Sequence, residues 1–245
     1  MTDLRREIEE QGFAVLPGLF GVERVGSLVC ELERARLELN DSVLQSRGHV
    51  YGIRNLSDVW PGAQAVAQDA CLYAAIGSVL GPGFGLVRSI FFDKPPGRTW
   101  SLPWHRDFTI AVRDSGEAAG EFRRPTVKAG VPHVEAPGWL LRRMVTARVA
   151  LDDVVEENGP LLVISGSHTD ANLEGLPSDR QLAAMAQPIH MRAGDVLLMR
   201  PLLLHRSGPS HPDTTRHRRT LHFEFAAEKA LPNGLQWYRF LGMAP

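Results

Sequence analysis

The chain has 245 residues, 44% of them hydrophobic, which is enough to bury a sizeable core. Its 27 Lys and Arg residues nearly balance 28 Asp and Glu residues, so the overall charge does not predict a nucleic acid or an anionic membrane as partner. The charged N-terminus lacks the apolar core of a signal peptide, no segment approaches the roughly 18 apolar residues of a membrane span, and the two cysteines have no metal or redox spacing. We therefore expect a cytoplasmic protein, monomeric or homodimeric, whose partner is a small molecule.

Three helices are expected in the first third of the chain. They run from Thr2 or Asp3 to Glu10, from Val22 to about Leu39, and from about Gly62 to Leu80. Thr2 or Asp3 can cap the first helix, and apolar residues recur at roughly helical spacing in the second. Gly12 and Gly81 are placed to end the first and third helices, and FAVLPGLF, directly after Gly12, is expected to be a strand that runs into a turn.

Short apolar segments separated by Gly and Pro turns follow the helices. They are FGLVRSIFFDK, WHRDFTIAV, MVTARVALDD, LLVISGSH, HMRAGDVLLMR and RTLHFEFA. Short strands preceded by helices predict a mainly β protein, a sandwich or barrel, with the N-terminal helices packed on one sheet. No repeat or linker divides the sequence, so residues 1–245 are expected to form a single domain.

One long segment, from about residue 113 to 140, is rich in Gly and Pro and is expected to be irregular. Loops of this length in a compact domain are usually functional or disordered. Because the segment begins a few residues after Asp107, we predict a lid or substrate loop, with a surface insertion as the alternative.

The candidate metal ligands lie in TWSLPWHRD and in an apolar run that ends at a histidine about a hundred residues later. In a strand, residues i and i+2 point to the same face, so His105 and Asp107 can present an imidazole and a carboxylate to one point. His205, at the end of GDVLLMRPLLLH, supplies a third ligand. Two histidines and one carboxylate on one side of a metal are typical of non-haem Fe(II) oxygenases.

The order of these motifs resembles the phytanoyl-CoA dioxygenase family of Fe(II)- and 2-oxoglutarate-dependent oxygenases. The matching stretches are QGFAVLPGLF, WHRD, ENGPLLVISGSH, GDVLLMRPLLLHRSGPS and HRRTLHFEF. The resemblance implies a double-stranded β-helix core (jelly-roll, cupin-like), with iron at His105, Asp107 and His205 and O2 and 2-oxoglutarate as cosubstrates. The family often has Gln where this chain has Arg106, and Pro where it has Ser165, but neither position is a ligand.

The distal carboxylate of 2-oxoglutarate needs a cation, and a guanidinium can bind it bidentately. Alternation along the last strand places Arg218 with Thr220 and His222 on one face, and Arg219 with the apolar residues on the other. If the apolar face packs on the helices, Arg218 points inward. We rank Arg218 first, Arg219 second and Arg216 third. Ser207, on the same face as His205, is a further candidate contact, and Lys94 is a possible second anion contact or an exposed strand-end lysine.

The substrate side of the site is less well marked. We expect contacts from Trp104, Phe108, His133 and Trp139, which predict a partly apolar pocket. His168, in a GSH turn, is expected to hold a loop by hydrogen bonding rather than to bind metal. His222 is a second histidine that can meet the substrate.

The leading hypothesis is a dioxygenase that hydroxylates an unactivated C–H bond of a small organic molecule, with release of succinate and CO2. In halogenating relatives a small residue replaces the carboxylate ligand, so the resemblance and Asp107 together favour hydroxylation. The alternatives are desaturation, epimerisation or cyclisation at the same iron, or a metal-binding β-barrel that has lost catalysis.

Overall fold

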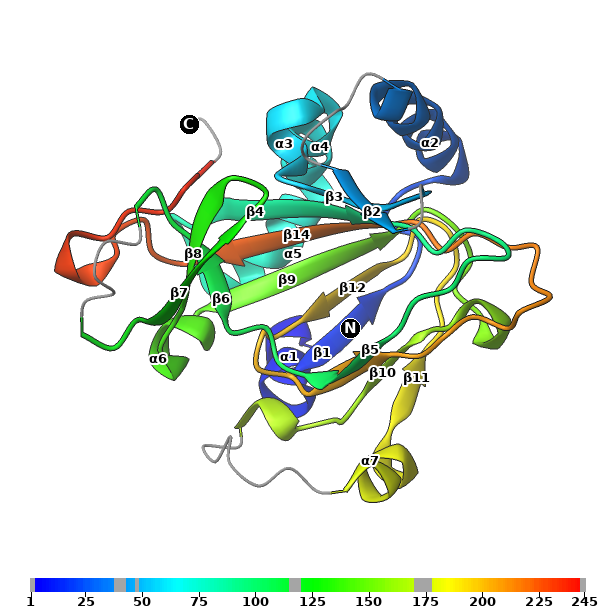
Figure 1. The fold of residues 1–245 in the computed structure, drawn as a ribbon. Coiled ribbons are helices and arrows are strands. Elements are labelled where there is room, and N and C mark those ends of the chain that lie inside the picture. Colours follow the sequence, from blue (N-terminus) through cyan, green and yellow to red (C-terminus); the bar gives the residue numbers. More distant parts are fainter. Residues whose placement is uncertain (1–2, 38–42, 47–48, 115–119, 170–177, 243–245) are drawn as a thin grey trace.

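The computed structural model describes residues 3–37, 43–46, 49–114, 120–169 and 178–242 (Figure 1). Its helices are α1 (Leu4–Gln11), α2 (Val22–Leu37), α3 (Leu56–Val59), α4 (Pro61–Ala67), α5 (Ala70–Leu80), α6 (Gly138–Leu141) and α7 (Asp179–Met185), with short 3-10 turns at Glu156–Asn158, Ser167–Thr169 and Pro232–Gly234. Its strands are β1 (Phe13–Leu16), β2 (Val43–Ser46), β3 (His49–Arg54), β4 (Gly85–Phe92), β5 (Leu102–His105), β6 (Thr109–Ala111), β7 (Arg123–Lys128), β8 (Val131–Glu135), β9 (Met144–Ala150), β10 (Leu161–Val163), β11 (Gln187–Ile189), β12 (Val196–Met199), β13 (His205–Ser207) and β14 (Thr220–Ala226).

The helix ends follow from local side-chain chemistry. Asp3 caps α1 by accepting the backbone N–H of Arg5 at 3.1 Å, and Gly12 ends the helix with φ 85°. The single helix expected from 62 to 80 is wrong, because α4 and α5 are separate. The Asp69 carboxylate accepts the backbone N–H groups of Cys71 and Leu72, and this cap begins a new helix. The expected helix from Val22 is α2, and residues 38–39 of its prediction lie outside the described residues.

Two antiparallel sheets form the core of the fold. The larger has the order β1-β12-β9-β14-β4-β3-β2 and the smaller β11-β10-β13-β5. In Figure 1 the helices α2, α3 and α4 lie above the larger sheet, and β5, β10 and β11 lie below it. This arrangement confirms the mainly β prediction with N-terminal helices packed on one sheet.

Strand β14 shows how the sequence separates the two faces of the larger sheet. Leu221, Phe223 and Phe225 are buried in the main hydrophobic core with residues of α1 to α5. His222 and Glu224, which alternate with them, point to the opposite face and line a cavity. The face toward the helices is therefore apolar, as the alternation predicts, and the inner face carries polar chemistry.

The segment from 113 to 140 is not irregular as expected. β7 and β8 form a hairpin that joins β6 in a third antiparallel sheet. Ala129 and Gly130 connect the two strands with φ values of 49° and 74°, and consecutive positive φ values are typical of type I′ hairpin turns. Residues 115–119 of the segment lie outside the described residues. In the part of the chain that the structure describes, no helix combines the length and apolar character needed to span a membrane.

Candidate metal centre

Three predicted ligands converge beside strands β5 and β13. His105 and His205 are direct partners across these antiparallel strands, and their ring centroids are 4.2 Å apart. Asp107 lies two residues past the end of β5, not within the strand as expected, and its backbone N–H donates to the carbonyl of Pro201 at 2.9 Å. Its two carboxylate oxygens lie 4.0 Å from His105 Nε2 and 3.8 Å from His205 Nε2. The three ligand atoms lie within 4.8 Å of one another, as ligands of a single metal ion must.

Backbone carbonyls orient both imidazoles. His105 Nδ1 lies 2.8 Å from the carbonyl of Pro103, and His205 Nδ1 lies 2.8 Å from that of Leu203. A carbonyl can only accept a hydrogen bond, so each Nδ1 carries a proton, and Nε2, which lies beside the Asp107 carboxylate, is left as the nitrogen that can bind a metal. Metal-binding histidines commonly have this second hydrogen bond.

The charge states also suit a metal site. Burial is the main cause that lowers the pKa of His205 to about 4, which leaves its imidazole neutral at pH 7. Burial opposes ionisation of Asp107, but the neighbouring His205 and His222 outweigh it and hold the pKa of this carboxyl below its usual value. Two imidazoles and a carboxylate match the donor set that non-haem Fe(II) prefers.

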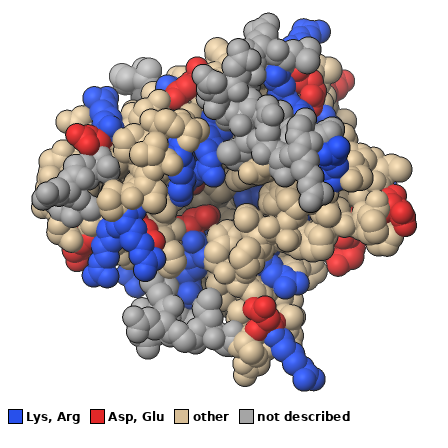
Figure 2. Space-filling view, viewed as in Figure 1, with Lys and Arg blue, Asp and Glu red and all other residues tan. Residues whose placement is uncertain are grey.

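The metal ligands open onto a cavity of about 350 Å³ between the two sheets. Figure 2 shows a hollow near the middle of this face with Lys and Arg side chains on several sides of it. The cavity is lined by the three ligands together with Tyr51, Arg54, Arg88, Ile90, Phe92, Trp100, Leu102, Thr109, Lys128, Arg148, Leu161, Ser207, His222 and Glu224.

Two buried cations lie beside this cavity. Lys94 and Arg218 exchange backbone hydrogen bonds of 3.2 and 3.1 Å, so their side chains leave neighbouring chains on the same side. Both reach Ser207 Oγ, Lys94 Nζ at 2.9 Å and Arg218 at 3.2 Å, and Arg218 also donates to the carbonyl of Gly159 at 2.7 Å. Lys94 is therefore buried, which corrects its alternative interpretation as an exposed strand-end lysine.

Neither of these cations has a carboxylate within ion-pair distance among the described residues. Burial, followed by the nearby charges of Arg218 and Arg148, lowers the pKa of Lys94 to about 6, and burial and Arg148 lower the pKa of Arg218 to about 9. Lys94 is therefore mostly neutral at pH 7 beside the charged Arg218, and a bound anion would favour the protonated form of both groups, so the pair marks a place where an anion would be stabilised. The indole of Trp100, which lines the cavity, lies over both cations, 4.7 Å from Lys94 Nζ and 5.6 Å from Arg218 Cζ.

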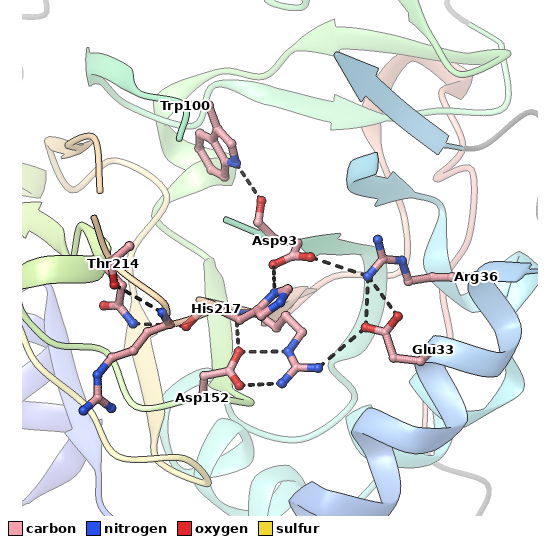
Figure 3. A network of polar contacts seen from close by, with 10 residues as sticks. Glu33, Arg36, Asp93, Trp100, Asp152, Thr214 and His217 are labelled. Atoms are coloured by element: carbon pink, nitrogen blue, oxygen red, sulfur yellow. Dashed lines mark hydrogen bonds and ion pairs between the residues drawn. The ribbon is translucent and has the colours of Figure 1, made fainter. Parts of the chain in front are cut away.

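The residues that alternate with Lys94 and Arg218 belong to a separate polar network (Figure 3). Asp93 is paired with His217 at 3.1 Å and with Arg36 at 3.5 Å. Arg219 is paired with Asp152 at 2.6 Å and lies 3.6 Å from Glu33 of α2. These contacts hold the chain entering β14 against α2, and this leaves Arg218 on the cavity side.

The structure thus separates the three candidate arginines. Arg218 is buried beside Ser207, whereas Arg219 is bound by Asp152 in the outer network. Arg216 is half-exposed and paired with Glu157 at 2.9 Å.

The four predicted substrate contacts are not on the cavity wall. Trp104 precedes His105 in β5, so it faces the other way and packs near Ile164, Leu182 and Leu204. Phe108 packs against a hydrophobic cluster that includes Val87 and Ile110. His133 is buried in β8, and Trp139 is exposed and donates to Glu121 at 2.7 Å. These four residues therefore belong to the surrounding core and surface.

Sequence reasoning missed four cationic residues that line the cavity: Arg54, Arg88, Lys128 and Arg148. Arg88 and Arg148 lie inside apolar strands, β4 and β9, and a charge at an inward position of such a strand was the available signal. Arg148 donates to His222 Nδ1 at 3.0 Å, and His222 Nε2 lies 3.2 Å from Glu224. His168 lies apart from the metal ligands, with its Nε2 3.1 Å from the carbonyl of Glu9, in keeping with a structural role.

Comparison with known proteins gives a family match and a set of similar folds. A family model described as phytanoyl-CoA dioxygenase (PhyH) matches residues 8–218. EctD from S. alaskensis, solved with 2-oxoglutarate and 5-hydroxyectoine, has a TM-score of 0.71 at 20% identity, covering 92% of this chain and 76% of that one. HygX from Streptomyces hygroscopicus, solved with nickel, 2-oxoglutarate and hygromycin B, has a TM-score of 0.65 at 22% identity, with coverage of 98% and 90%.

A third similar structure is SnoN, described as a non-heme alpha ketoglutarate dependent epimerase from nogalamycin biosynthesis. Its TM-score is 0.68 at 18% identity, with coverage of 97% of this chain and 90% of that one. No curated protein sequence matches the chain. At these identities the likeness establishes the fold, and it confirms the expected jelly-roll core.

Proposed function

Since the chain belongs to the phytanoyl-CoA dioxygenase family and is a non-haem iron, 2-oxoglutarate-dependent oxygenase, we propose that it hydroxylates an unactivated C–H bond of a small, partly apolar organic molecule. The reaction would release succinate and CO2. The observation that carries this proposal is the intact set of His105, Asp107 and His205 facing a cavity that has buried, uncompensated cations beside it.

His105, Asp107 and His205 are the proposed iron ligands. A ferrous ion would supply activation of O2 coupled to oxidative decarboxylation of 2-oxoglutarate. The protein contributes the orientation of the ligands: the carbonyls of Pro103 and Leu203 fix the two imidazoles, and Pro201 fixes the backbone of Asp107. All three ligands come from one side, so the remaining coordination positions face the cavity.

Arg218 is the proposed partner of the distal carboxylate of 2-oxoglutarate, with Ser207 and Lys94 as additional donors. Their polar atoms already converge on Ser207 Oγ, and no described carboxylate neutralises the two cations. Arg219, ranked second from the sequence, is occupied by Asp152 and is not proposed as a contact. Because Trp100 covers both cations, we expect its indole to shift when the cosubstrate binds.

An anaerobic titration with Fe(II) and then 2-oxoglutarate tests this assignment. We expect a weak visible charge-transfer band of the chelate, and a change in tryptophan fluorescence that is lost in Trp100→Phe. Folded, iron-containing protein that gives no band would contradict the proposed cosubstrate.

Substitution of the two neighbouring arginines tests the role of Arg218. Arg218→Ala should raise the concentration of 2-oxoglutarate needed for half-saturation by more than about tenfold, because a hydrogen bond to a charged group contributes roughly 1.5–3 kcal/mol. Arg219→Ala is the matched control and should change this concentration much less, since its guanidinium bonds Asp152. If the two variants behave in the opposite way, the assignment of the inward face is wrong.

A different oxidative outcome is the second candidate, favoured by the likeness to SnoN, described as an epimerase, and to SnoK, described as a carbocyclase. Labelling with oxygen isotope separates the candidates once a substrate is found. Hydroxylation transfers one atom of labelled O2 to the product, whereas epimerisation, desaturation and cyclisation transfer none.

A further inference from the structure

The residues on the inner face of β14 are polar and form one row beside the cavity. Thr220, His222 and Glu224 alternate along this face, and Arg218 precedes them in the same alternation. Inward positions of a strand are about 6.6 Å apart, so Arg218 lies roughly 13 Å before His222 and Glu224 lies about 6.6 Å beyond it. His222 is close enough to Asp107 for the two charges to interact. The proposed cosubstrate cations therefore lie on one side of the metal ligands, and Glu224 lies on the other.

A second group of cations surrounds Glu224. Arg88 of β4 is the direct cross-strand partner of Glu224, and Arg54 of β3 pairs with Ile90, the partner of His222. Lys128 reaches the same cavity from the hairpin of β7 and β8. These three residues, Arg54, Arg88 and Lys128, are called the distal cation group below. They come from three strands and all line the cavity.

The distal cation group carries more positive charge than the protein neutralises. Glu224 accepts from Arg88 at 3.1 Å and also contacts His222 at 3.2 Å. Lys128 Nζ donates to Thr109 Oγ1 at 3.0 Å, and neither Lys128 nor Arg54 has a carboxylate within ion-pair distance among the residues that the structure describes. Burial, and then the charge of Arg88, lowers the pKa of both residues. Like charges held together in a half-buried place destabilise the empty cavity, and a bound anion would remove that repulsion.

We propose that Arg54, Arg88 and Lys128 bind a carboxylate or phosphate group of the substrate. The substrate is then a small organic oxyanion whose apolar part lies against Ile90, the cavity-lining residue next to Arg88 on the inner face of β4. This inference rests on the proposed function, because the metal marks where the substrate reacts. The charged group anchors one end of the molecule, so the C–H bond presented to the iron is a fixed distance from the oxyanion.

Calorimetric titration of simple probes tests the charge preference without turnover. The protein is first saturated with Ni(II), which does not support the oxidation, and with 2-oxoglutarate, so that the site of Arg218 is filled. Phenylacetate, phenyl phosphate and the neutral phenylacetamide are then titrated separately. We expect at least one anion to bind on the order of tenfold tighter than the amide, and the better of the two anions identifies the kind of oxyanion.

Two variants test whether the preference for an anion over the amide arises from the distal cation group. The double substitution Arg54→Gln and Lys128→Gln should remove it, whereas Arg123→Gln, an exposed cation on the same hairpin, should retain it. Absence of anion binding, equal affinity for the amide, or a preference that survives in the double variant would each overturn the inference.

A separate titration of 2-oxoglutarate distinguishes failure of this inference from failure of the proposed function. Failure of 2-oxoglutarate to bind, with an anion preference that persists in Arg218→Gln, would contradict the proposed function and support the distal cation group.

Discussion

At the scale of single residues, the side chains of the three metal ligands make few hydrogen bonds to the rest of the described protein. Each histidine uses Nδ1 on a carbonyl two residues earlier in the chain, and Asp107 is anchored by its backbone rather than by its carboxylate. The carboxylate is therefore free to bind a cation. Removal of the His105 side chain costs one hydrogen bond to a carbonyl, and removal of the Asp107 side chain leaves its backbone hydrogen bond in place, so the cost to folding is small compared with the cost to metal binding.

His105→Ala and Asp107→Ala should each abolish stoichiometric iron binding while leaving the fold intact. The site then has two donors, which are too few to hold Fe(II) against its hydration shell. Iron content after anaerobic loading and desalting measures the effect, with circular dichroism to verify folding. His190→Ala, the loss of an exposed histidine, is the control and should bind iron as the wild type does. Near-wild-type iron in either ligand variant would refute the assignment of that ligand.

At the scale of elements, the hairpin of β7 and β8 pairs with β6, and one of the paired residues is a buried histidine. His133 of β8 pairs with Ala111 of β6, and its Nδ1 donates to the carbonyl of Val131 at 2.9 Å. Its Nε2 is buried and has no hydrogen-bond partner among the residues that the structure describes. Burial, followed by the charge of Arg88, lowers the pKa of His133 to about 4.

This histidine should make stability depend on pH. Between about pH 6.5 and pH 4 the unfolded chain binds a proton that native His133 does not, so stability falls as the pH falls through this window. From an unfolded pKa of about 6.5, the loss contributed by His133 at pH 5 is about 2 kcal/mol. Urea unfolding at pH 7.5 and pH 5 measures it, and His133→Phe should lose about 2 kcal/mol less than the wild type. An identical loss in the variant would show that other groups, such as His205, account for the acid sensitivity.

The same elements show what the sequence could and could not predict. Alternation in RTLHFEFA predicted that Leu221, Phe223 and Phe225 face the helices, and so placed Arg218 inward, because one face of that strand is uniformly apolar. Lys94 was ambiguous, since DKPPGR has the composition of an exposed turn and its burial depends on a cross-chain pairing with Arg218. The hairpin of β7 and β8 was missed because its Gly and Pro residues indicated a loop. Arg54 and Lys128 reach the cavity through such long-range pairing, which local pattern does not encode.

At the scale of the whole molecule, the metal ligands come from one sheet and the loop after it, whereas the proposed cosubstrate contacts come from both sheets. His105 and His205 both come from the smaller sheet, and Asp107 follows β5 directly, so a metal ion joins elements that are already paired. The proposed cosubstrate contacts come from both sheets. Ser207 belongs to β13, whereas Lys94 follows β4 and Arg218 precedes β14 of the larger sheet. Binding of 2-oxoglutarate should therefore link the two sheets at one end of the cavity and supply the counter-ion that Arg218 and Lys94 lack among the described residues.

Cosubstrate binding should accordingly raise the melting temperature of the iron-loaded protein under anaerobic conditions. A ligand that binds only the native state stabilises it by about 2.7 kcal/mol at 100 times its Kd, which for a chain of this length corresponds to a shift of roughly 5–10 °C. Arg218→Ala, measured at the same 2-oxoglutarate concentration, should show about half of this shift or less, because a Kd raised tenfold or more leaves at most about 1.4 kcal/mol of stabilisation. The melting temperature of this variant without ligand should match or exceed that of the wild type, since the substitution removes a buried cation that has no counter-ion. A full shift in Arg218→Ala would mean that the cosubstrate is held elsewhere in the cavity, with Arg148 as the next cation to test.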